Sequence, residues 1–253
     1  MSDATKPPVA TAEPSDGLTT WPHLVRVEFL VALAAMLVLT VWSIVLDAPL
    51  EEAANPNRTP DPSKAPWYFL GLQELLVYFD PWIAGVVVPL LIIVGLMAIP
   101  YLDRNPAGNG YFTLRQRPFA IATFLFGFLG LWIIPIVIGV FCRGPGWNWY
   151  WPWESWDVAK TVDLRNVNLT DLLGIRDATA ATWLGGLLLA GWFGLGGVFW
   201  LWQRKSLALL QLGAARYAIV AFLWLSMAGI VVKMALRLAL NVKYVWVSPW
   251  FSV

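Results

Sequence analysis

The chain has 253 residues, of which 58% are hydrophobic and 13% are charged, and its formal net charge is +1. A soluble domain of this length cannot hide so much apolar surface, so the composition excludes a soluble protein and indicates an integral membrane protein. The small net charge gives no reason to expect nucleic acid as a partner.

The chain contains one cysteine, Cys142, and one histidine, His23. A single cysteine allows neither a disulfide framework nor a Cys-x-x-Cys-His haem attachment within the chain. A b-type haem held by two imidazoles needs a second histidine. We therefore expect this chain to bind no haem covalently, to ligate none by itself, and to hold no metal ion.

Residues 1–20 are rich in Pro, Thr, Ala and Ser, and we expect a mobile tail without the apolar core of a signal peptide. Five apolar runs follow, each long enough, with its flanks, to cross a hydrocarbon layer about 30 Å thick. They predict an all-α integral membrane fold with five transmembrane helices, at 29–46, 82–102, 119–142, 181–202 and 217–240. In the last run, Lys233 and Arg237 are expected to extend to the near membrane surface.

Basic residues concentrate in two of the connecting loops, 103–118 and 203–216. Such loops face the cytoplasm, so we expect a multi-pass protein of a bacterial inner membrane with a cytoplasmic N-terminus. The 47–81 and 143–180 loops then lie on the outer side.

The 47–81 loop contains the sequence Pro66-Trp67-Tyr68-Phe69, which begins a short apolar segment at 67–79. That segment is too short to span a membrane, and we expect an interfacial helix on the outer side. It carries a single carboxylate, Glu74. The aromatic residues alone would fit an interfacial anchor equally well.

Several short motifs surround these aromatic residues in a fixed order: Trp21-Pro22, Asn55-Pro56, Thr59-Pro60, the Pro66–Phe69 motif and Arg115-Gln116-Arg117-Pro118. In this order and at nearly this spacing, residues 21–142 resemble subunit IV of the cytochrome bf complex. That subunit is equivalent to the C-terminal part of cytochrome b in the respiratory bc complexes. Residues 143–253, an outer aromatic loop with two further helices, look like the extended C-terminal halves of bacterial menaquinol-using complexes.

The resemblance implies a non-haem-ligating subunit of a quinol–cytochrome c reductase that forms part of the outer quinol-oxidation pocket. Pro66, Trp67, Tyr68 and Phe69 would contact the quinol, and menaquinol is the expected type. The partners implied are a cytochrome b N-terminal subunit holding haem b, a Rieske iron–sulfur protein and a c-type cytochrome, in a dimeric complex. An extra inner-side haem c is left open.

One departure concerns the proton acceptor. The family motif is Pro-Glu-Trp-Tyr, and this chain has Pro66 where the family has Glu. Quinol oxidation needs a base within hydrogen-bond reach of the ring hydroxyl. The nearest candidate is Glu74, on the same short helix as Tyr68, which would form a hydrogen-bonding wall. The alternative is that Glu74 points to water or neutralises a partner's charge; Asp80 and Lys64 are weaker candidates.

On the inner side, His23, Arg26 and Arg115 are candidates for a quinone or proton path. The alternative for His23 is an ordinary surface residue with a hydrogen bond. Phe29 falls where subunit IV places an aromatic side chain against the extra inner-side haem, and ordinary packing is its alternative.

Two further features concern contacts with neighbours. Four aspartates of the second outer loop lack metal-binding spacing and are expected to shape a docking surface for a Rieske head or cytochrome c: Asp157, Asp163, Asp171 and Asp177. A small-residue stripe at Gly186, Ala190 and Gly194 would let another helix approach, within this chain or in another subunit.

Two other functions remain open. One is a quinone-binding membrane anchor of another respiratory complex. The other is a non-redox scaffold or transporter subunit, although transporters more typically bury ionisable groups in mid-span, and the first four spans contain none.

Overall fold

The computed structural model describes residues 20–47, 53, 55–108, 113–157, 159–160 and 166–253. The expected tail, 1–20, lies outside this range except for Thr20. The described residues contain five helices long and apolar enough to cross a membrane: Thr20–Val45, Ile83–Leu102, Pro118–Phe141, Ala178–Gln203 and Ala214–Leu240. The predicted all-α membrane fold with five spans is therefore confirmed. The chain divides into two units, Met1–Arg58 and Thr59–Val253.

The first unit contains one described helix, made of η1 (Thr20–Leu24) and α1 (Val25–Val45). The sequence placed the start of this span at Phe29 because Arg26 and Glu28 precede it. The helix begins earlier, since charged side chains do not interrupt helical hydrogen bonding. His23, Arg26 and Phe29 are all exposed, and no residue of α1 is buried. Such an apolar helix needs lipid or other helices around it.

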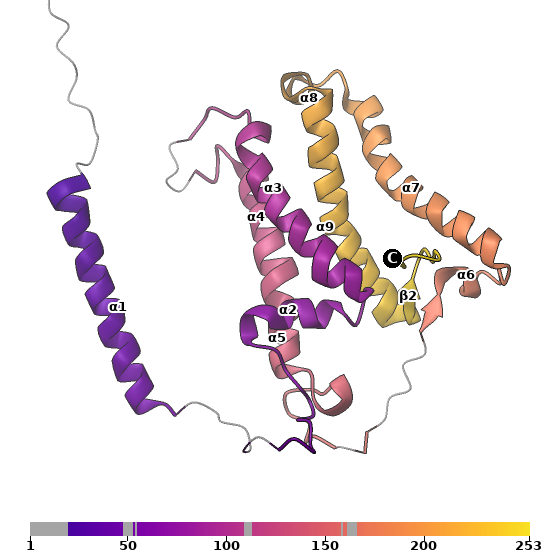
Figure 1. Ribbon diagram of the computed structural model, residues 1–253. Helices are drawn as coiled ribbons and strands as arrows, with labels where there is room; N and C mark the ends of the chain where they lie inside the picture. Colours follow the sequence, from indigo (N-terminus) through magenta and orange to yellow (C-terminus); the bar gives the residue numbers. More distant parts are fainter. Residues whose placement is uncertain (1–19, 48–52, 54, 109–112, 158, 161–165) are drawn as a thin grey trace, which may run out of the picture. The chain divides into compact units, whose positions relative to one another are not determined.

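The second unit contains the other four spans (Figure 1). These are η2 (Ile83–Val87) with α3 (Val88–Leu102), then α4 (Pro118–Leu125), η3 (Phe126–Ile133) and α5 (Ile134–Phe141) as one continuous helix, then α7 (Ala178–Gln203) and α9 (Ala214–Leu240). We call one end of this bundle the α2 end. It carries α2 (Trp67–Leu75), η4 (Pro145–Trp147), β1 (Val167–Asn168), α6 (Leu169–Leu172) and β2 (Val242–Tyr244), with β1 and β2 paired in parallel. The opposite, α8 end carries the 103–117 loop and α8 (Leu207–Leu212).

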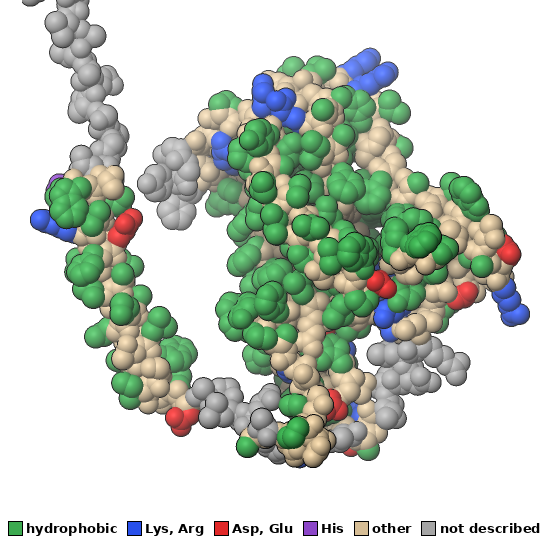
Figure 2. All heavy atoms as spheres, in the orientation of Figure 1, with side chains coloured by type: hydrophobic (Ala, Val, Ile, Leu, Met, Phe, Trp, Pro, Cys, Tyr) green, Lys and Arg blue, Asp and Glu red, His purple; other side chains and the backbone are tan. Residues whose placement is uncertain are grey.

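Most of the bundle surface is apolar, as a lipid-facing protein requires. Figure 2 shows hydrophobic side chains over the middle of the second unit, with charged side chains gathered toward its ends. The expected membrane environment agrees with this distribution.

Three of the described membrane-spanning helices contain π-helical segments, η1, η2 and η3, and a proline lies just after the last two. Pro89 follows η2, and Pro135 follows η3. Proline has no N–H for the preceding turn and its ring crowds the carbonyl four residues earlier. The wider π turn accommodates that crowding without ending the span.

The crossing of α2 over α5 depends on two glycines. A Cβ on Gly139 would lie 2.8 Å from Cγ of Leu70, and a Cβ on Gly71 would lie 3.1 Å from Cγ1 of Ile136. The helices approach this closely because neither position carries a side chain. The far end of α2 continues into a small core of Leu75, Tyr78, Phe79, Ala84 and Val88, against which Ile230 and Met234 of α9 pack.

The burial of Lys233 and Arg237 differs from the prediction. Both residues are buried, each with 5% of its surface exposed, so the prediction that they extend to the membrane surface is wrong for the folded chain. The last turns of α9 pack against the core at the end of α2 and against β2. Nζ of Lys233 has no hydrogen-bond partner among the residues that the structure describes, and it lies 5.6 Å from the ring centre of Phe79 and 5.9 Å from that of Tyr244.

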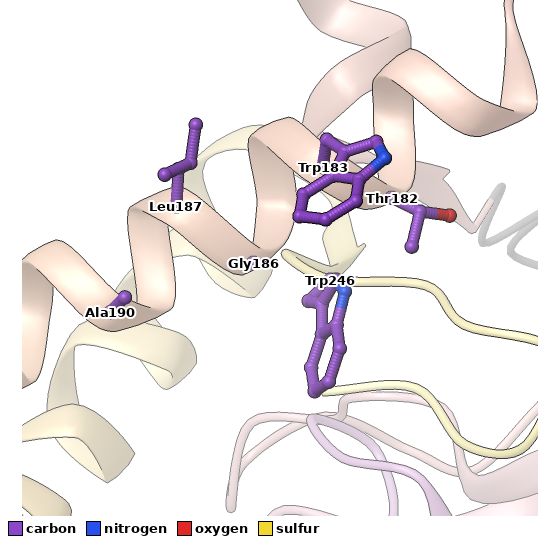
Figure 3. Close-up of a pocket in the computed structure, with 6 residues that line it drawn as sticks. All are labelled: Thr182, Trp183, Gly186, Leu187, Ala190 and Trp246. Atoms are coloured by element: carbon purple, nitrogen blue, oxygen red, sulfur yellow. The ribbon is translucent and has the colours of Figure 1, made fainter.

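The small-residue stripe on α7 lies partly under the C-terminal segment of the same chain. Gly186 and Ala190 line a cavity of about 410 Å³ (Figure 3), together with Thr182, Trp183, Leu187 and Trp246. Trp246 packs against Gly186, whereas no atom lies within 4 Å of where a Cβ of Gly194 would stand. The stripe therefore serves a contact within the chain at Gly186 and is open at Gly194.

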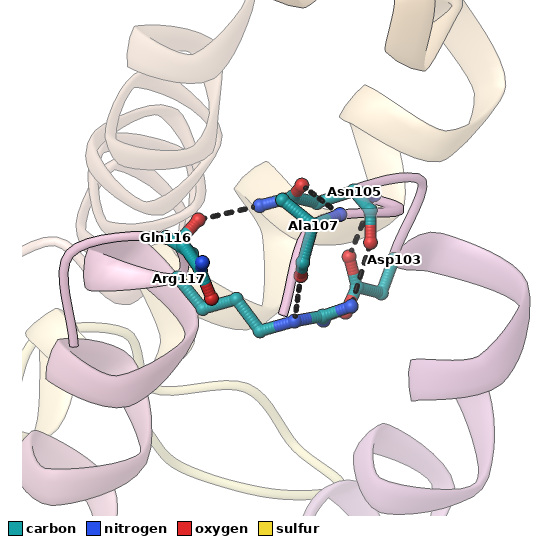
Figure 4. A network of polar contacts seen from close by, with 5 residues as sticks. All are labelled: Asp103, Asn105, Ala107, Gln116 and Arg117. Atoms are coloured by element: carbon teal, nitrogen blue, oxygen red, sulfur yellow. Dashed lines mark hydrogen bonds and ion pairs between the residues drawn. The ribbon is translucent and has the colours of Figure 1, made fainter. Parts of the chain in front are cut away.

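At the α8 end, Arg117 organises the loop between α3 and α4 (Figure 4). Its guanidinium forms an ion pair with Asp103 and donates to the carbonyls of Asn105 and Ala107. The side-chain amide of Asn105 donates to the carbonyl of Gln116. These contacts of Arg117 stabilise the loop between α3 and α4.

Candidate functional site

The start of α2 is fixed by local hydrogen bonds. The carbonyl of Pro66 accepts from the amides of Phe69 and Leu70, at 2.8 and 3.1 Å. Gln73 reaches back from the next turn: its Oε1 accepts from the amide of Ala65 at 2.7 Å, and its Nε2 donates to the carbonyl of Ser63 at 2.8 Å. Proline suits position 66 because an amide at a helix start has no intrahelical acceptor to lose.

The first turn of α2 presents three adjacent aromatic side chains, which we call the aromatic turn. Trp67, Tyr68 and Phe69 are 66%, 47% and 53% exposed. The ring centres of Trp67 and Tyr68 are 5.8 Å apart, and those of Tyr68 and Phe69 are 4.9 Å apart. The result is an apolar surface that carries two polar groups, the hydroxyl of Tyr68 and the indole N–H of Trp67.

Glu74 lies on the opposite, buried side of α2 and is 0% exposed. Its carboxylate accepts four hydrogen bonds. Oε1 accepts from Nη2 of Arg143 at 2.6 Å and from the hydroxyl of Tyr78 at 2.8 Å. Oε2 accepts from Nε of Arg143 at 2.9 Å and from Nε1 of Trp147 at 3.2 Å. Both oxygens are thus fully used, and the arginine binds both of them.

In the cluster formed by Glu74, Tyr78, Arg143 and Trp147, one negative charge faces one positive charge. Burial raises the pKa of Tyr78, and the negative charge of Glu74 raises it further, so the hydroxyl stays neutral. Burial by itself lowers the pKa of Arg143, but the hydrogen bonds and charge of Glu74 outweigh that effect and leave the pKa raised. The cluster therefore holds a cation and a neutral phenol around one carboxylate.

The loop after α5 folds back around Arg143. The amide of Tyr150 donates to the carbonyl of Cys142 at 2.9 Å, and Nη1 of Arg143 donates to the carbonyl of Trp147 at 3.1 Å. Gly146 and Trp147 both have left-handed backbones, with φ of 63° and 56°. That conformation is unfavourable for Trp147, and it is maintained where the indole reaches Glu74.

Two more contacts join the segment before α2 to α5 and its following loop. Oδ1 of Asp61 accepts from the amide of Gly146 at 2.7 Å, and Nζ of Lys64 donates to the carbonyl of Val140 at 2.8 Å. Burial lowers the pKa of Lys64. Asp80 accepts from the amide of Trp82 at the start of the next helix.

The structure separates two residues that the sequence placed together. Tyr68 and Glu74 share α2, but six residues at roughly 100° each put them about 120° apart around the helix. Sequence reasoning singled out Glu74 and missed its partners Tyr78, Arg143 and Trp147. A signal was present: a lone carboxylate on an apolar helix and a lone arginine just after an apolar span are a natural ion pair.

Other predicted site residues lie in varied surroundings. Arg115 is exposed in the turn before α4. Asp171 and Asp177 accept backbone hydrogen bonds at the starts of α6 and α7, and Asp157 accepts one from Ala159. Asp163 lies outside the described residues. The docking role of these aspartates stays a prediction.

The segment that contains α2 is similar to a known protein family. Residues 53–139 match the family model described as cytochrome b(C-terminal)/b6/petD. The match covers about a third of the chain and ends just before Arg143. No solved structure matches the chain.

The cytochrome b C-terminal family supports a place for this chain in a cytochrome b6f/bc-type complex, among the quinol–electron-carrier oxidoreductases. Quinone and haem b are the cofactors that the family suggests for such a complex. The single histidine of this chain cannot supply two imidazoles, and the described residues contain no group of three or more His, Cys, Asp or Glu that could hold a metal ion. Which chain holds haem b stays a prediction.

Proposed function

We propose that this chain is a non-haem-ligating subunit of a quinol–cytochrome c reductase, and that the aromatic turn forms one wall of its outer quinol-oxidation pocket. The observation that carries the proposal is the exposure of Trp67, Tyr68 and Phe69 within the family segment. A soluble protein would bury three adjacent aromatic side chains, and here the helix that carries them is held rigidly beneath.

The aromatic turn suits a quinol chemically. A quinol ring is flat and apolar with a hydroxyl at each end, so it can stack on aromatic side chains while Tyr68 hydrogen-bonds a ring oxygen. The crossing at Gly71 and Gly139 and the contacts of Lys64 and Glu74 fix α2 in place. A fixed wall orients the ring and lowers the entropy lost on the way to reaction.

Glu74 is the proposed acceptor of a quinol proton, under a condition set by its surroundings. All four acceptor positions of the carboxylate are in use, so a proton must displace one donor. The neutral donors Tyr78 and Trp147 leave at lower cost than Arg143, because Arg143 carries the opposite charge and binds both oxygens of the carboxylate. Rotation of the Tyr78 hydroxyl would free Oε1 while Arg143 stays in place.

Electrons are carried by groups on other chains. Haem b on a cytochrome b N-terminal subunit and the iron–sulfur centre of a Rieske protein would take one electron each, and this chain supplies binding and orientation. We further propose menaquinol as the substrate, a c-type cytochrome as acceptor, a dimeric complex, and a bacterial inner-membrane location with a cytoplasmic N-terminus. His23, Arg26 and Arg115 are proposed for an inner-side quinone or proton path, and Phe29 for contact with an extra inner-side haem c.

The test is quinol-dependent reduction of haem b in the purified complex. Trp67→Ala and Tyr68→Phe should raise KM for quinol or lower kcat by about tenfold, the effect of losing about 1.4 kcal/mol of binding or transition-state stabilisation. Trp202→Ala is the matched control, since Trp202 is 75% exposed at the α8 end. If the Trp67 and Trp202 variants behave alike, the aromatic turn is not part of the pocket. Purification as a colourless single chain would instead favour a non-redox scaffold.

A further inference from the structure

We infer that Arg143 is a positioning residue for quinol oxidation, which holds α2 against the end of α5 and fixes the carboxylate of Glu74 through a buried ion pair. The inference rests on the proposed function and concerns a residue outside the family segment. Arg143 touches no substrate in this scheme. It acts through Glu74, the only carboxylate of α2.

The geometry singles out arginine at position 143. Its Nε and Nη2 bind the two carboxylate oxygens of Glu74, while Nη1 binds the carbonyl of Trp147. Only a planar guanidinium offers three donors in this fixed arrangement, whereas a lysine ammonium would satisfy one oxygen at a time. Arg143 therefore sets both the position and the orientation of the carboxylate.

The charged groups around Glu74 leave Arg143 as its main support. From its own segment Glu74 meets the neutral hydroxyl of Tyr78, and from the loop after α5 it meets Arg143 and the neutral indole of Trp147. Lys64, another cation of this region, donates to the carbonyl of Val140 instead. Without Arg143, the charge of a carboxylate that is 0% exposed would have no ion-pair partner among the described residues, and a buried charge without a partner is strongly unfavourable.

The same contact has a mechanical consequence. Glu74 lies two turns after the aromatic turn, and Arg143 directly follows the end of α5. Arg143 ties α2 to the end of α5, while Lys64 and Asp61 tie the segment before α2 to Val140 and Gly146. Loosening these contacts should disturb the aromatic turn as well as the position of the Glu74 carboxylate.

The experiment compares four variants of the purified complex: Arg143→Gln, Arg143→Lys, Glu74→Gln and the double variant Glu74→Gln with Arg143→Gln. Quinol-dependent reduction of haem b is measured across pH, together with thermal unfolding. In Arg143→Gln, the acid limb of the pH–rate profile should move upward by about one pH unit, with kcat about tenfold lower below it and recovering at high pH. Arg143→Lys should recover part of the rate and restore the acid limb.

The double variant separates charge from structure. It replaces the ion pair by two neutral amides, so its thermal stability should return toward that of the native complex, while its rate stays low without recovery at high pH. If Arg143→Gln lowers stability but leaves KM, kcat and the pH profile unchanged, Arg143 is merely structural and the inference is wrong. If Arg143→Gln does not assemble, a native rate and pH profile in the double variant would overturn the inference in the same way.

Failure of the proposed function looks different. In that case Trp67→Ala has the same KM and kcat as its Trp202→Ala control. The thermal stabilities of Glu74→Gln, Arg143→Gln and the double variant would still show that the two residues interact. If Trp67→Ala loses rate but Arg143→Gln has a native pH profile, the proposed pocket is supported. The positioning role of Arg143 is then wrong.

Discussion

Replacing Gly139 by alanine tests how the quinol-pocket helix is seated. The new Cβ would lie 2.8 Å from Cγ of Leu70 and 3.2 Å from its Cδ2, and Cγ is a branch point that cannot move independently of the helix. Overpacking of this kind costs about 1–3 kcal/mol. Alanine also gains up to about 1 kcal/mol over glycine within a helix.

A matched control variant separates the clash from alanine's higher helix preference. Gly191 lies in the middle of α7 and has no atom within 4 Å of where its Cβ would stand, so Gly191→Ala gains the helix preference without the clash. The difference between the two variants should therefore equal the clash, about 1–3 kcal/mol in the free energy of unfolding.

The assay is unfolding of the purified complex followed by intrinsic fluorescence, with KM for quinol measured alongside. Gly139→Ala should be less stable than Gly191→Ala and should raise KM, because α2 must shift away from α5. In a Leu70→Ala background, Gly139→Ala should cost less stability than it does in the native chain, because the side chain that it meets has been shortened. Equal stability of the two glycine variants would refute the account of the α2–α5 crossing.

Two other changes test buried polar groups. Because the folded-state pKa of Tyr78 is raised above its ordinary value of 10.0, the stability it contributes is fully present below pH 10 and is lost as the pH rises through the folded-state pKa. Tyr78→Phe should therefore flatten the alkaline fall in thermal stability and cost about 1–3 kcal/mol at neutral pH, and an unchanged alkaline slope would contradict this. Lys233→Met replaces a buried ammonium without a hydrogen-bond partner and should stabilise the chain by about 1–4 kcal/mol. A loss of stability in the assembled complex would instead show that another subunit or a lipid supplies an anion to Lys233.

The sequence predicted the parts of the fold that depend on hydropathy. Long apolar runs predicted all five spans, and the helix beginning at Trp67 was expected from its length and position. Helix ends were less accurate. The first span starts nine residues before Phe29, because Arg26 and Glu28 count against a span in composition but not against a helix.

Contacts between distant residues were beyond the sequence reasoning. Glu74 and Arg143 are 69 residues apart, and nothing in either local pattern states that α2 crosses α5 at Gly71 and Gly139. The same limit explains Lys233. In a single helix a lysine near the end reaches the membrane surface, and only the packing of α9 against the end of α2 shows that this one is enclosed.

The most direct test of the central claim is photoaffinity labelling of the purified complex with an azido-quinol, followed by peptide mapping of this chain. The account predicts labelling within Pro66–Phe69 that is prevented by excess unlabelled quinol. Competable labelling confined to other chains, or to the loop at the α8 end, would contradict it.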